Sequence, residues 1–355
     1  MGKTIKDVAF AAGVSTATVS RVMAEDNHRP VTEKTRTRVI EAAKMLGYRM
    51  NYTARSLKRQ ETMTIGVIFP ALANDFFMDV AEGIEQGLYA EGYTMLLSPS
   101  FNSVEEEKKR ISMLAGRMVD GILIIPAGIQ GEHLQALSDQ GMPMVMMDRI
   151  VESAGLDAVT SDNEEGTFRL TKALLADGFK QIAFVGGEIT LSTARERLSG
   201  YKKALVEAGI DPDPSRICLS GMEVKDGYLH MENLLKKQNP PQAMVAVNLL
   251  VHLGMERCLL DMKGSAPPVV IAGFDDSRYT PFLPACRYIA SQDAVGMGMA
   301  ASRRIIEMIR EKKNPGFENK KNGEKIVRLP VTISRLVQDG TKGGTLIEIE
   351  TAKLI

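Results

Sequence analysis

The sequence predicts an N-terminal all-α helix-turn-helix domain followed by an α/β core of two doubly wound lobes. Three observations predict this fold class. The first 48 residues hold three short amphipathic segments separated by turn residues. From residue 64 onward, short and nearly continuous apolar runs alternate with segments of helical spacing, which is typical of parallel sheets covered on both faces. The alternation breaks and restarts near residue 160, so we expect two lobes.

The composition is that of an ordinary globular protein. The chain has 355 residues, of which 44% are hydrophobic and 25% are charged, so it has room for more than one domain. No segment approaches the roughly 20 uninterrupted apolar residues that a membrane span needs. Cys218, Cys258 and Cys286 are widely spaced, which favours reduced thiols over a disulfide framework. We therefore expect a cytoplasmic protein with no membrane partner.

The stretch from Thr4 to Met23 predicts two short helices that meet at a tight turn. Thr4 and Asp7 form a capping-box pattern, Gly13 ends the first helix, and Ser15 can cap the second. The side chains expected on the outer face of the second helix are Thr16, Ala17, Ser20 and Arg21. Such a narrow, polar helix can enter a DNA major groove. Any two amphipathic helices around a glycine would share this pattern. On the evidence of the turn alone, an ordinary helix pair without a DNA-binding role is therefore the alternative.

The distribution of charge favours DNA binding at the N-terminal end. Residues 1–60 carry 12 Lys and Arg against 5 Asp and Glu, whereas residues 61–355 carry 32 against 39. Thr32 can cap a third helix that ends at Gly47. The basic segment 51–60 predicts a helix that is too short to be stable alone, with Leu57 suited to insertion in a minor groove. A plain charged linker is the alternative for this segment.

The sequence pattern from residue 64 onward predicts two series of strands and helices. We expect the strands of the first series at 64–70, 94–99, 121–126 and 144–148, and those of the second at 159–162, 181–187, 243–248 and 269–276. The helices are expected at 77–90, 104–114, 132–138, 164–176, 194–208, 227–236, 251–262 and 294–310. Residues 288–293 and 325–333 predict late strands that cross back between the lobes, which would make each lobe discontinuous.

Polar side chains follow several predicted strands. They are Asp148, Arg149, Asp162, Asn163, Asn248, Asp275, Asp276, Gln292 and Asp293. Open α/β sheets bind ligands beyond the carboxyl ends of their strands. A ring of carboxylates, amides and an arginine suits a small polyol or sugar, because hydroxyl groups both donate and accept hydrogen bonds. Polar residues also occur at strand ends simply because the chain leaves the sheet there.

The sequence offers no catalytic or metal site. His28, His133, His230 and His252 lack metal-ligand spacing, and neither a P-loop nor a G-x-S-x-G motif occurs. The run VGMGMA, residues 295–300, fits a dinucleotide motif in letters only, since no acidic residue follows at the required distance. We therefore expect no enzyme activity, no cofactor and no metal.

With the order of its elements assembled, the chain resembles the LacI/GalR family of bacterial transcription regulators over residues 3–337. The resemblance rests on TIKDVAFAAGVSTATVSRVM, TRTRVIEAAKMLGY, NYTARSLKR, TIGVIFP, MVDGILIIP, SDNEEG, STARERLSGYKKAL and VVIAGFDD, in this order. It implies a periplasmic-binding-protein-like core behind the helix-turn-helix.

The resemblance also implies the functional residues. DNA-binding residues would be Thr4, Ser15, Thr16, Ala17, Thr18, Arg21, Asn51, Ala54 and Leu57. Effector-binding residues would be Asn74, Phe76, Asp148, Arg149, Arg197, Asn248 and Asp275. Two departures from the family pattern stand out: Leu249 replaces an aspartate that commonly binds sugars, and Met50 replaces a proline before the hinge.

The resemblance implies a homodimeric repressor that binds a palindromic operator and is controlled by a small molecule, a sugar or sugar derivative, in the cleft between the lobes. The alternative is a free-standing sugar-binding protein of the periplasmic type. The expected domains are 1–48, a hinge at 49–60, a core at 61–340 and a tail at 341–355. Lobe 1 would comprise about 61–160 and 292–324, and lobe 2 about 161–291 and 325–340. The tail lacks a heptad helix, so no coiled-coil tetramer is expected.

Overall fold

A computed structural model describes residues 3–23, 31–48, 61–313, 325–339 and 343–348. The chain divides into two compact units, with the boundary after Thr62. The expected hinge segment 49–60, with Asn51, Ala54 and Leu57, lies outside the described residues.

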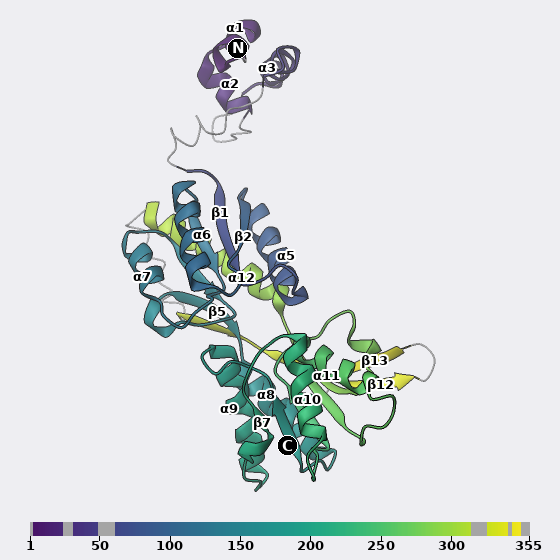
Figure 1. The fold of residues 1–355 in the computed structure, drawn as a ribbon. Helices are drawn as coiled ribbons and strands as arrows, with labels where there is room; N and C mark the ends of the chain where they lie inside the picture. The colour runs from purple at the N-terminus through teal and green to yellow at the C-terminus, as the bar shows by residue number, and fades with distance from the viewer. Residues whose placement is uncertain (1–2, 24–30, 49–60, 314–324, 340–342, 349–355) are drawn as a thin grey trace. The chain divides into compact units, whose positions relative to one another are not determined.

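The N-terminal unit is a three-helix bundle (Figure 1) of α1 (Ile5–Ala12), α2 (Thr16–Met23) and α3 (Glu33–Met45). Thr4 begins α1 through the expected capping box, in which the Asp7 carboxylate accepts a hydrogen bond from the Thr4 backbone nitrogen at 2.7 Å. Gly13 ends α1 with φ +61°, a left-handed conformation that favours glycine. The fully buried side chains Val8, Val19 and Val39 hold the three helices together. The helix-turn-helix prediction is confirmed.

The first lobe of the second unit is built on a six-stranded parallel sheet with the order β11-β5-β4-β3-β1-β2. Its strands are β1 (Thr64–Phe69), β2 (Thr94–Pro99), β3 (Gly121–Ile124), β4 (Met144–Met147), β5 (Asp157–Ser161) and β11 (Ile326–Leu329). Its helices are α5 (Asp75–Tyr89), α6 (Val104–Gly116), α7 (Glu132–Asp139), the 3₁₀ turn η1 (Glu152–Ala154) and α12 (Ala294–Lys313). Two separate apolar clusters cover the two faces, one with α5 and α12 and the other with α6 and α7.

The second lobe is built on a seven-stranded sheet with the order β13-β12-β10-β9-β8-β6-β7. Its strands are β6 (Ile182–Val185), β7 (Ile217–Cys218), β8 (Ala243–Ala246), β9 (Val270–Phe274), β10 (Cys286–Gln292), β12 (Val331–Asp339) and β13 (Gly343–Glu348). Its helices are α8 (Asn163–Ala176), α9 (Ser192–Glu207), α10 (Val224–Leu235) and α11 (Leu249–Asp261), with 3₁₀ turns η2 (Pro214–Arg216) and η3 (Thr280–Phe282). The pairs β10/β12 and β12/β13 are antiparallel, and the other pairs are parallel.

The late run 325–333, which we expect to form one strand of the second lobe, instead forms two strands in different sheets. Residues 326–329 form β11, which pairs with β5 in the first sheet, and β12 begins after Pro330 in the second. Proline lacks a backbone N–H to donate to a sheet ladder, so the run divides there.

Two further expectations were wrong. The segment 159–162, expected at the start of the second series, lies at the end of β5, which pairs with β4 in the first sheet, and the second lobe begins with α8. Of the expected tail 341–355, residues 343–348 form β13, which pairs with β12. Both segments are short, and the spacing of apolar residues alone does not indicate which strand each one pairs with.

Close helix packing in the first lobe depends on glycine. A Cβ atom added to Gly83 of α5 would lie 2.0 Å from the backbone oxygen of Val295 in α12. The absence of a side chain therefore lets the two helices approach closely, and it fixes α5, whose first residues face the second lobe.

Candidate functional site

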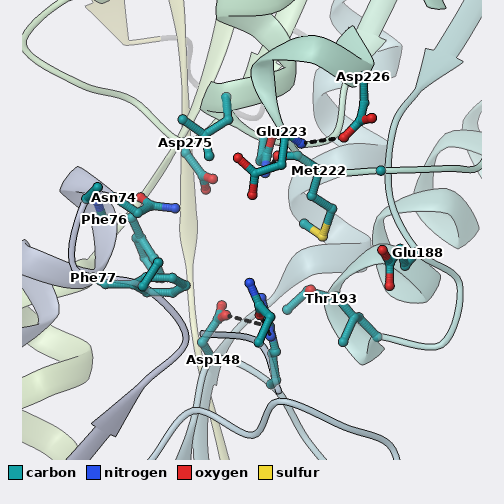
Figure 2. A pocket seen from close by; sticks show the side chains of 18 of the residues that line it. Asn74, Phe76, Phe77, Asp148, Glu188, Thr193, Met222, Glu223, Asp226 and Asp275 are labelled. Carbon is teal, nitrogen blue, oxygen red and sulfur yellow. Dashed lines mark hydrogen bonds and ion pairs between the residues drawn. The ribbon is translucent and has the colours of Figure 1, made fainter. Parts of the chain in front are cut away.

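A cavity of about 530 Å³ lies between the two lobes of the second unit. Figure 2 shows Asn74, Phe76 and Phe77 of the first lobe facing Asp275, Glu223 and Met222 of the second across it. The lining residues are Ala71, Ala73, Asn74, Phe76, Phe77, Asn102, Ala127, Asp148, Arg149, Glu188, Leu191, Thr193, Arg197, Gly221, Met222, Glu223, Lys225, Asp226, Asn248, Leu250, Asp275 and Gln292. All seven residues expected to bind an effector are among them, because the carboxyl ends of the parallel strands in both sheets meet at this opening.

Arg197, on the second turn of α9, is 3% exposed and fixed on several sides. Its Nε donates to Oδ1 of Asn163 at 2.8 Å, and one terminal nitrogen donates to the Val247 carbonyl at 2.6 Å. The other terminal nitrogen lies 3.8 Å from a carboxylate oxygen of Asp275. The guanidinium also stacks on the ring of Phe274, with its central carbon 3.7 Å from the ring centroid. These contacts hold the planar group in one orientation at the cavity wall.

Asp148 and Arg149 follow β4 and form a second buried charge pair. The Asp148 carboxylate lies 4.0 Å from Nε of Arg149, and both residues are less than a tenth exposed. Asp148 has φ +57°, which turns the chain sharply at the end of the strand. Burial raises the pKa of Asp148, against the opposing effect of Arg149. One terminal nitrogen of Arg149 donates to Asn102 Oδ1 at 2.9 Å and to the Pro126 carbonyl at 3.2 Å, so the guanidinium is locked by the ends of β2 and β3.

Asp275 and Gln292 form a polar pair at the ends of β9 and β10. Nε2 of Gln292 donates to Oδ1 of Asp275 at 2.5 Å. The Gln292 Oε1 atom is buried and has no hydrogen-bond partner among the residues that the structure describes. An acceptor of this kind at a cavity wall favours a ligand that donates a hydrogen bond.

Asn74 and Asn248 start helices at the cavity wall, and part of each side chain is therefore already used. Asn74 Oδ1 accepts from the Phe76 backbone nitrogen at 3.0 Å, and Asn248 Oδ1 accepts from the Val251 backbone nitrogen at 2.9 Å. Asn248 also donates to the Met222 carbonyl at 3.1 Å. What each residue can still offer a ligand is chiefly an amide N–H.

Four of the polar residues at strand ends do not line the cavity. Asp162 and Asp293 cap α8 and α12, and Asp276 accepts from the Ser277 backbone nitrogen. Asn163 lies behind Arg197. The rule that ligands bind beyond strand ends therefore selects the correct edge, but it does not separate ligand-facing groups from helix caps.

Several residues that line the cavity are not among those expected from the sequence. Asn102, Ala127 and Glu188 follow β2, β3 and β6, so the same rule would have found them had it been applied to every strand. Thr193, Met222, Glu223, Lys225 and Asp226 belong to the loops and first turns of α9 and α10, and no local pattern marks them.

The expected DNA-binding residues that the structure describes lie at the starts of α1 and α2 and along α2. Ser15 accepts a hydrogen bond from the Thr18 backbone nitrogen at 3.2 Å and so caps α2 as expected. Thr16, Ala17 and Ser20 are exposed and Arg21 is half-buried, while Val19 and Val22 face the bundle. The outer face of α2 thus carries short side chains that a nucleic acid could approach.

Together, a helix-turn-helix unit and a two-lobed unit with a polar cavity define a DNA-binding protein with a sensor domain. The chain belongs to the LacI family of bacterial transcriptional regulators. The family model described as "Bacterial regulatory proteins, lacI family" matches residues 4–51, and the model described as "Periplasmic binding proteins and sugar binding domain of LacI family" matches residues 62–334. Members of this family are transcriptional regulators and not enzymes.

Individual relatives agree with this assignment. The transcriptional regulator RegA of Clostridium saccharobutylicum is 34% identical over 315 residues, which cover 88% of this chain and 94% of RegA. The transcriptional repressor PurR of Haemophilus influenzae is 34% identical over 312 residues, which cover 87% of this chain and 92% of PurR.

Solved structures share the fold. The complex of the transcriptional regulator CelR with cellobiose has a TM-score of 0.68 and 26% identity, and the match covers 93% of this chain and 98% of CelR. The lac repressor dimer bound to operator and the anti-inducer ONPF has a TM-score of 0.78 and 24% identity, and the match covers 94% of this chain and 98% of that one.

Within the described part of the chain, no group of three or more His, Cys, Asp or Glu side chains is arranged to hold a metal ion. None of the helices described is both long enough and apolar enough to cross a bilayer.

Proposed function

We propose that the protein is a homodimeric repressor that binds a palindromic operator and responds to a small, uncharged, hydroxyl-rich ligand, a sugar or sugar derivative, in the cavity between its lobes. The observation that carries the ligand proposal is the arrangement of Arg197, Asp275 and Gln292 at the cavity wall. The free-standing sugar-binding protein is the weaker alternative, because the chain includes the helix-turn-helix unit of a family of DNA-binding regulators.

The hydrogen-bonding groups of the cavity suit hydroxyls. Arg197 has five N–H donors, and the contacts described above occupy two of them and point a third toward Asp275. The carboxylate of Asp275 and the Oε1 atom of Gln292, which has no partner among the described residues, supply acceptors. A hydroxyl group both donates and accepts, so a polyol can satisfy both sets. The rings of Phe76 and Phe77 add an apolar wall with centroids 5.6 Å apart, suited to the C–H face of a sugar ring.

The charges of the cavity favour an uncharged ligand over a sugar phosphate or sugar acid. Arg197 is paired with Asp275, and Arg149 is paired with Asp148. The remaining charged lining residues are Glu188, Glu223, Asp226 and Lys225. Helix N-termini attract anions. Here, however, Asn74, Asn248 and Asp226 side chains accept from backbone nitrogens at the starts of α5, α11 and α10. These caps leave the helix N-termini less free to bind an anion. Because carboxylates outnumber cationic side chains in the lining, a phosphate would be repelled.

The operator proposal rests on α2. Its outer face carries Thr16, Ala17 and Arg21 in positions from which side chains can reach base edges, and the Ser15 hydroxyl at its N-terminus can donate to a phosphate. A symmetric dimer presents two such helices, and this implies a palindromic site.

A thermal-shift screen of the full chain tests the ligand proposal, with neutral and phosphorylated sugars in matched pairs such as fructose with fructose 1-phosphate, together with ribose and cellobiose. A ligand at 100 times its dissociation constant should stabilise the protein by about 2.7 kcal/mol. We expect a neutral sugar to stabilise the protein, with Arg197→Lys abolishing the shift. Arg195→Lys is the matched control, because Arg195 lies on the same helix but bonds to the Thr190 carbonyl at the surface. A larger shift with the phosphorylated partner that is lost in Arg197→Lys would contradict an uncharged ligand.

Selection of binding sites from random duplexes tests the operator proposal. We expect the full chain to enrich a palindrome, and its affinity to fall steeply as salt rises, because phosphate contacts release counterions. Arg21→Ala should reduce the preference for the palindrome over random duplex, whereas Lys34→Ala on α3 should leave that preference unchanged. Equal affinity of the wild-type protein for the palindrome and for random DNA would refute the operator role.

A further inference from the structure

The residue behind Arg197 has a fixed orientation of its own. Asn163, the first residue of α8, is fully buried. Its Oδ1 accepts from Arg197 Nε, while its Nδ2 donates to the Ser161 carbonyl at 3.1 Å and to Oε2 of Glu196 at 3.2 Å. A guanidinium only donates and a carboxylate only accepts, so the amide can face these two neighbours in one way only.

Glu196 extends this contact chain to the first lobe. Its two carboxylate oxygens accept from both terminal nitrogens of Arg328, at 2.8 and 3.1 Å. Glu196 lies on α9 of the second lobe, and Arg328 lies on β11 of the first-lobe sheet. The two-point geometry is directional as well as charged, and the hydrogen bonds to Glu196 raise the pKa of Arg328.

The chain of contacts ends at the junction of the lobes. Ser161, which accepts from Asn163, is the last residue of β5 before the crossover to α8. Arg328 is one residue from the end of β11, before the crossover to β12. The two crossovers are hydrogen-bonded to each other, because the Asp162 backbone nitrogen donates to the Leu329 carbonyl at 2.8 Å. Any change in the angle between the lobes must act on this segment.

We infer that Asn163, Glu196 and Arg328 are positioning residues that tie the orientation of Arg197 to the junction between the lobes. A change at either end of the chain then alters the other, which is the reciprocity that allosteric linkage requires. The regulatory meaning of this link rests on the proposed function, whereas the link itself requires neither DNA nor a ligand.

The test measures the exchange of the Arg197 Nε–H with water while a substitution changes Arg328, at the other end of this series of contacts. In the full-length protein labelled with ¹⁵N-arginine, the Nε–H signal of Arg197 is identified by its loss in Arg197→Lys, and its exchange rate with water is then measured. We expect Arg328→Gln to raise that rate at least threefold, because releasing Glu196 frees Asn163. Arg328→Lys keeps the positive charge but not the two-point contact, and should fall between wild type and Arg328→Gln.

Arg304→Gln is the matched control. Arg304 is exposed to a similar degree and donates to Asp157 at 2.6 Å, but both residues belong to the first lobe. The control should leave the Arg197 rate within twofold of wild type. Glu196→Gln removes one of the two acceptor oxygens and the negative charge on the second-lobe side, and should change the rate in the same direction as Arg328→Gln. An unchanged Arg197 rate in both Arg328→Gln and Glu196→Gln, or an equal increase in Arg304→Gln, would overturn the inference. A wild-type protein that binds neither a palindrome nor a sugar would refute the proposed function and leave this result standing.

Discussion

Asn74 and Asn248 hold corresponding places in the two lobes, each as the N-cap of a helix that begins at the cavity wall. The Asn74 side chain starts α5 and the Asn248 side chain starts α11, each by accepting from a backbone nitrogen two or three residues further on. The cavity is therefore bounded on both sides by side chains that also hold helices in place, and a substitution at either position affects folding as well as binding.

We predict that Asn248→Ala lowers the free energy of unfolding by about 1 kcal/mol, because it removes the cap of α11. Asn248→Ser retains a hydroxyl acceptor for the cap and should recover most of that loss, although it cannot reach the Met222 carbonyl. Thermal unfolding of the two variants beside wild type measures the difference. Equal losses of stability in the alanine and serine variants would show that the cap hydrogen bond is not the main contribution of this side chain to the free energy of unfolding.

The stability of Asp148→Asn relative to wild type should rise with pH. Burial raises the pKa of Asp148 in the folded protein, so its protonated form is favoured by folding. Its stabilising contribution is complete below the unfolded-chain pKa of about 3.9 and is lost as the pH rises through the folded-state pKa. Asparagine does not titrate, so its contribution to stability does not change with pH, and it tolerates the left-handed backbone at this position. Denaturant unfolding from pH 3.5 to 7.5 measures the difference, and a relative stability that falls as pH rises would contradict the sign.

Gly83→Ala should destabilise the first lobe by about 1–3 kcal/mol, because the new methyl group meets the Val295 backbone oxygen in α12 and the helices must separate. Gly116→Ala is the control. Gly116 is the last residue of α6, and a Cβ there would meet nothing within 4 Å in the part of the chain that the structure describes. The control should be neutral or stabilise by up to about 1 kcal/mol, since alanine loses less conformational freedom than glycine on folding. Urea unfolding distinguishes the two, and a neutral Gly83→Ala would show that the helices can move apart freely.

Ser15→Ala should weaken α2 by about 1 kcal/mol, because the hydroxyl that caps its Thr18 backbone nitrogen is lost. Hydrogen exchange of the α2 amides in the full chain should accelerate accordingly. Ser20→Ala removes an exposed hydroxyl from the same helix and should leave exchange unchanged. Similar exchange in the two variants would mean that the turn, and not the cap, fixes the start of α2.

The elements of this protein follow closely from local sequence signals. The caps at Thr4, Ser15 and Thr32 begin helices, and short apolar runs form strands. These signals act over a few residues, so a linear reading can detect them. The strand-end rule likewise located the edge of the sheets where Asp148 and Asp275 converge.

The sequence by itself determined the fold class, the family and the polar character of the cleft, because each depends on residue types at fixed spacings along the chain. The tertiary structure decided what depends on distant partners: that Pro330 separates two strands of different sheets, that β13 joins the second lobe, and that Asn163 lies behind Arg197 and not in the cavity. Strand pairing and side-chain hydrogen bonds are chosen by competition among groups far apart in the chain, and no local period records the outcome of that competition.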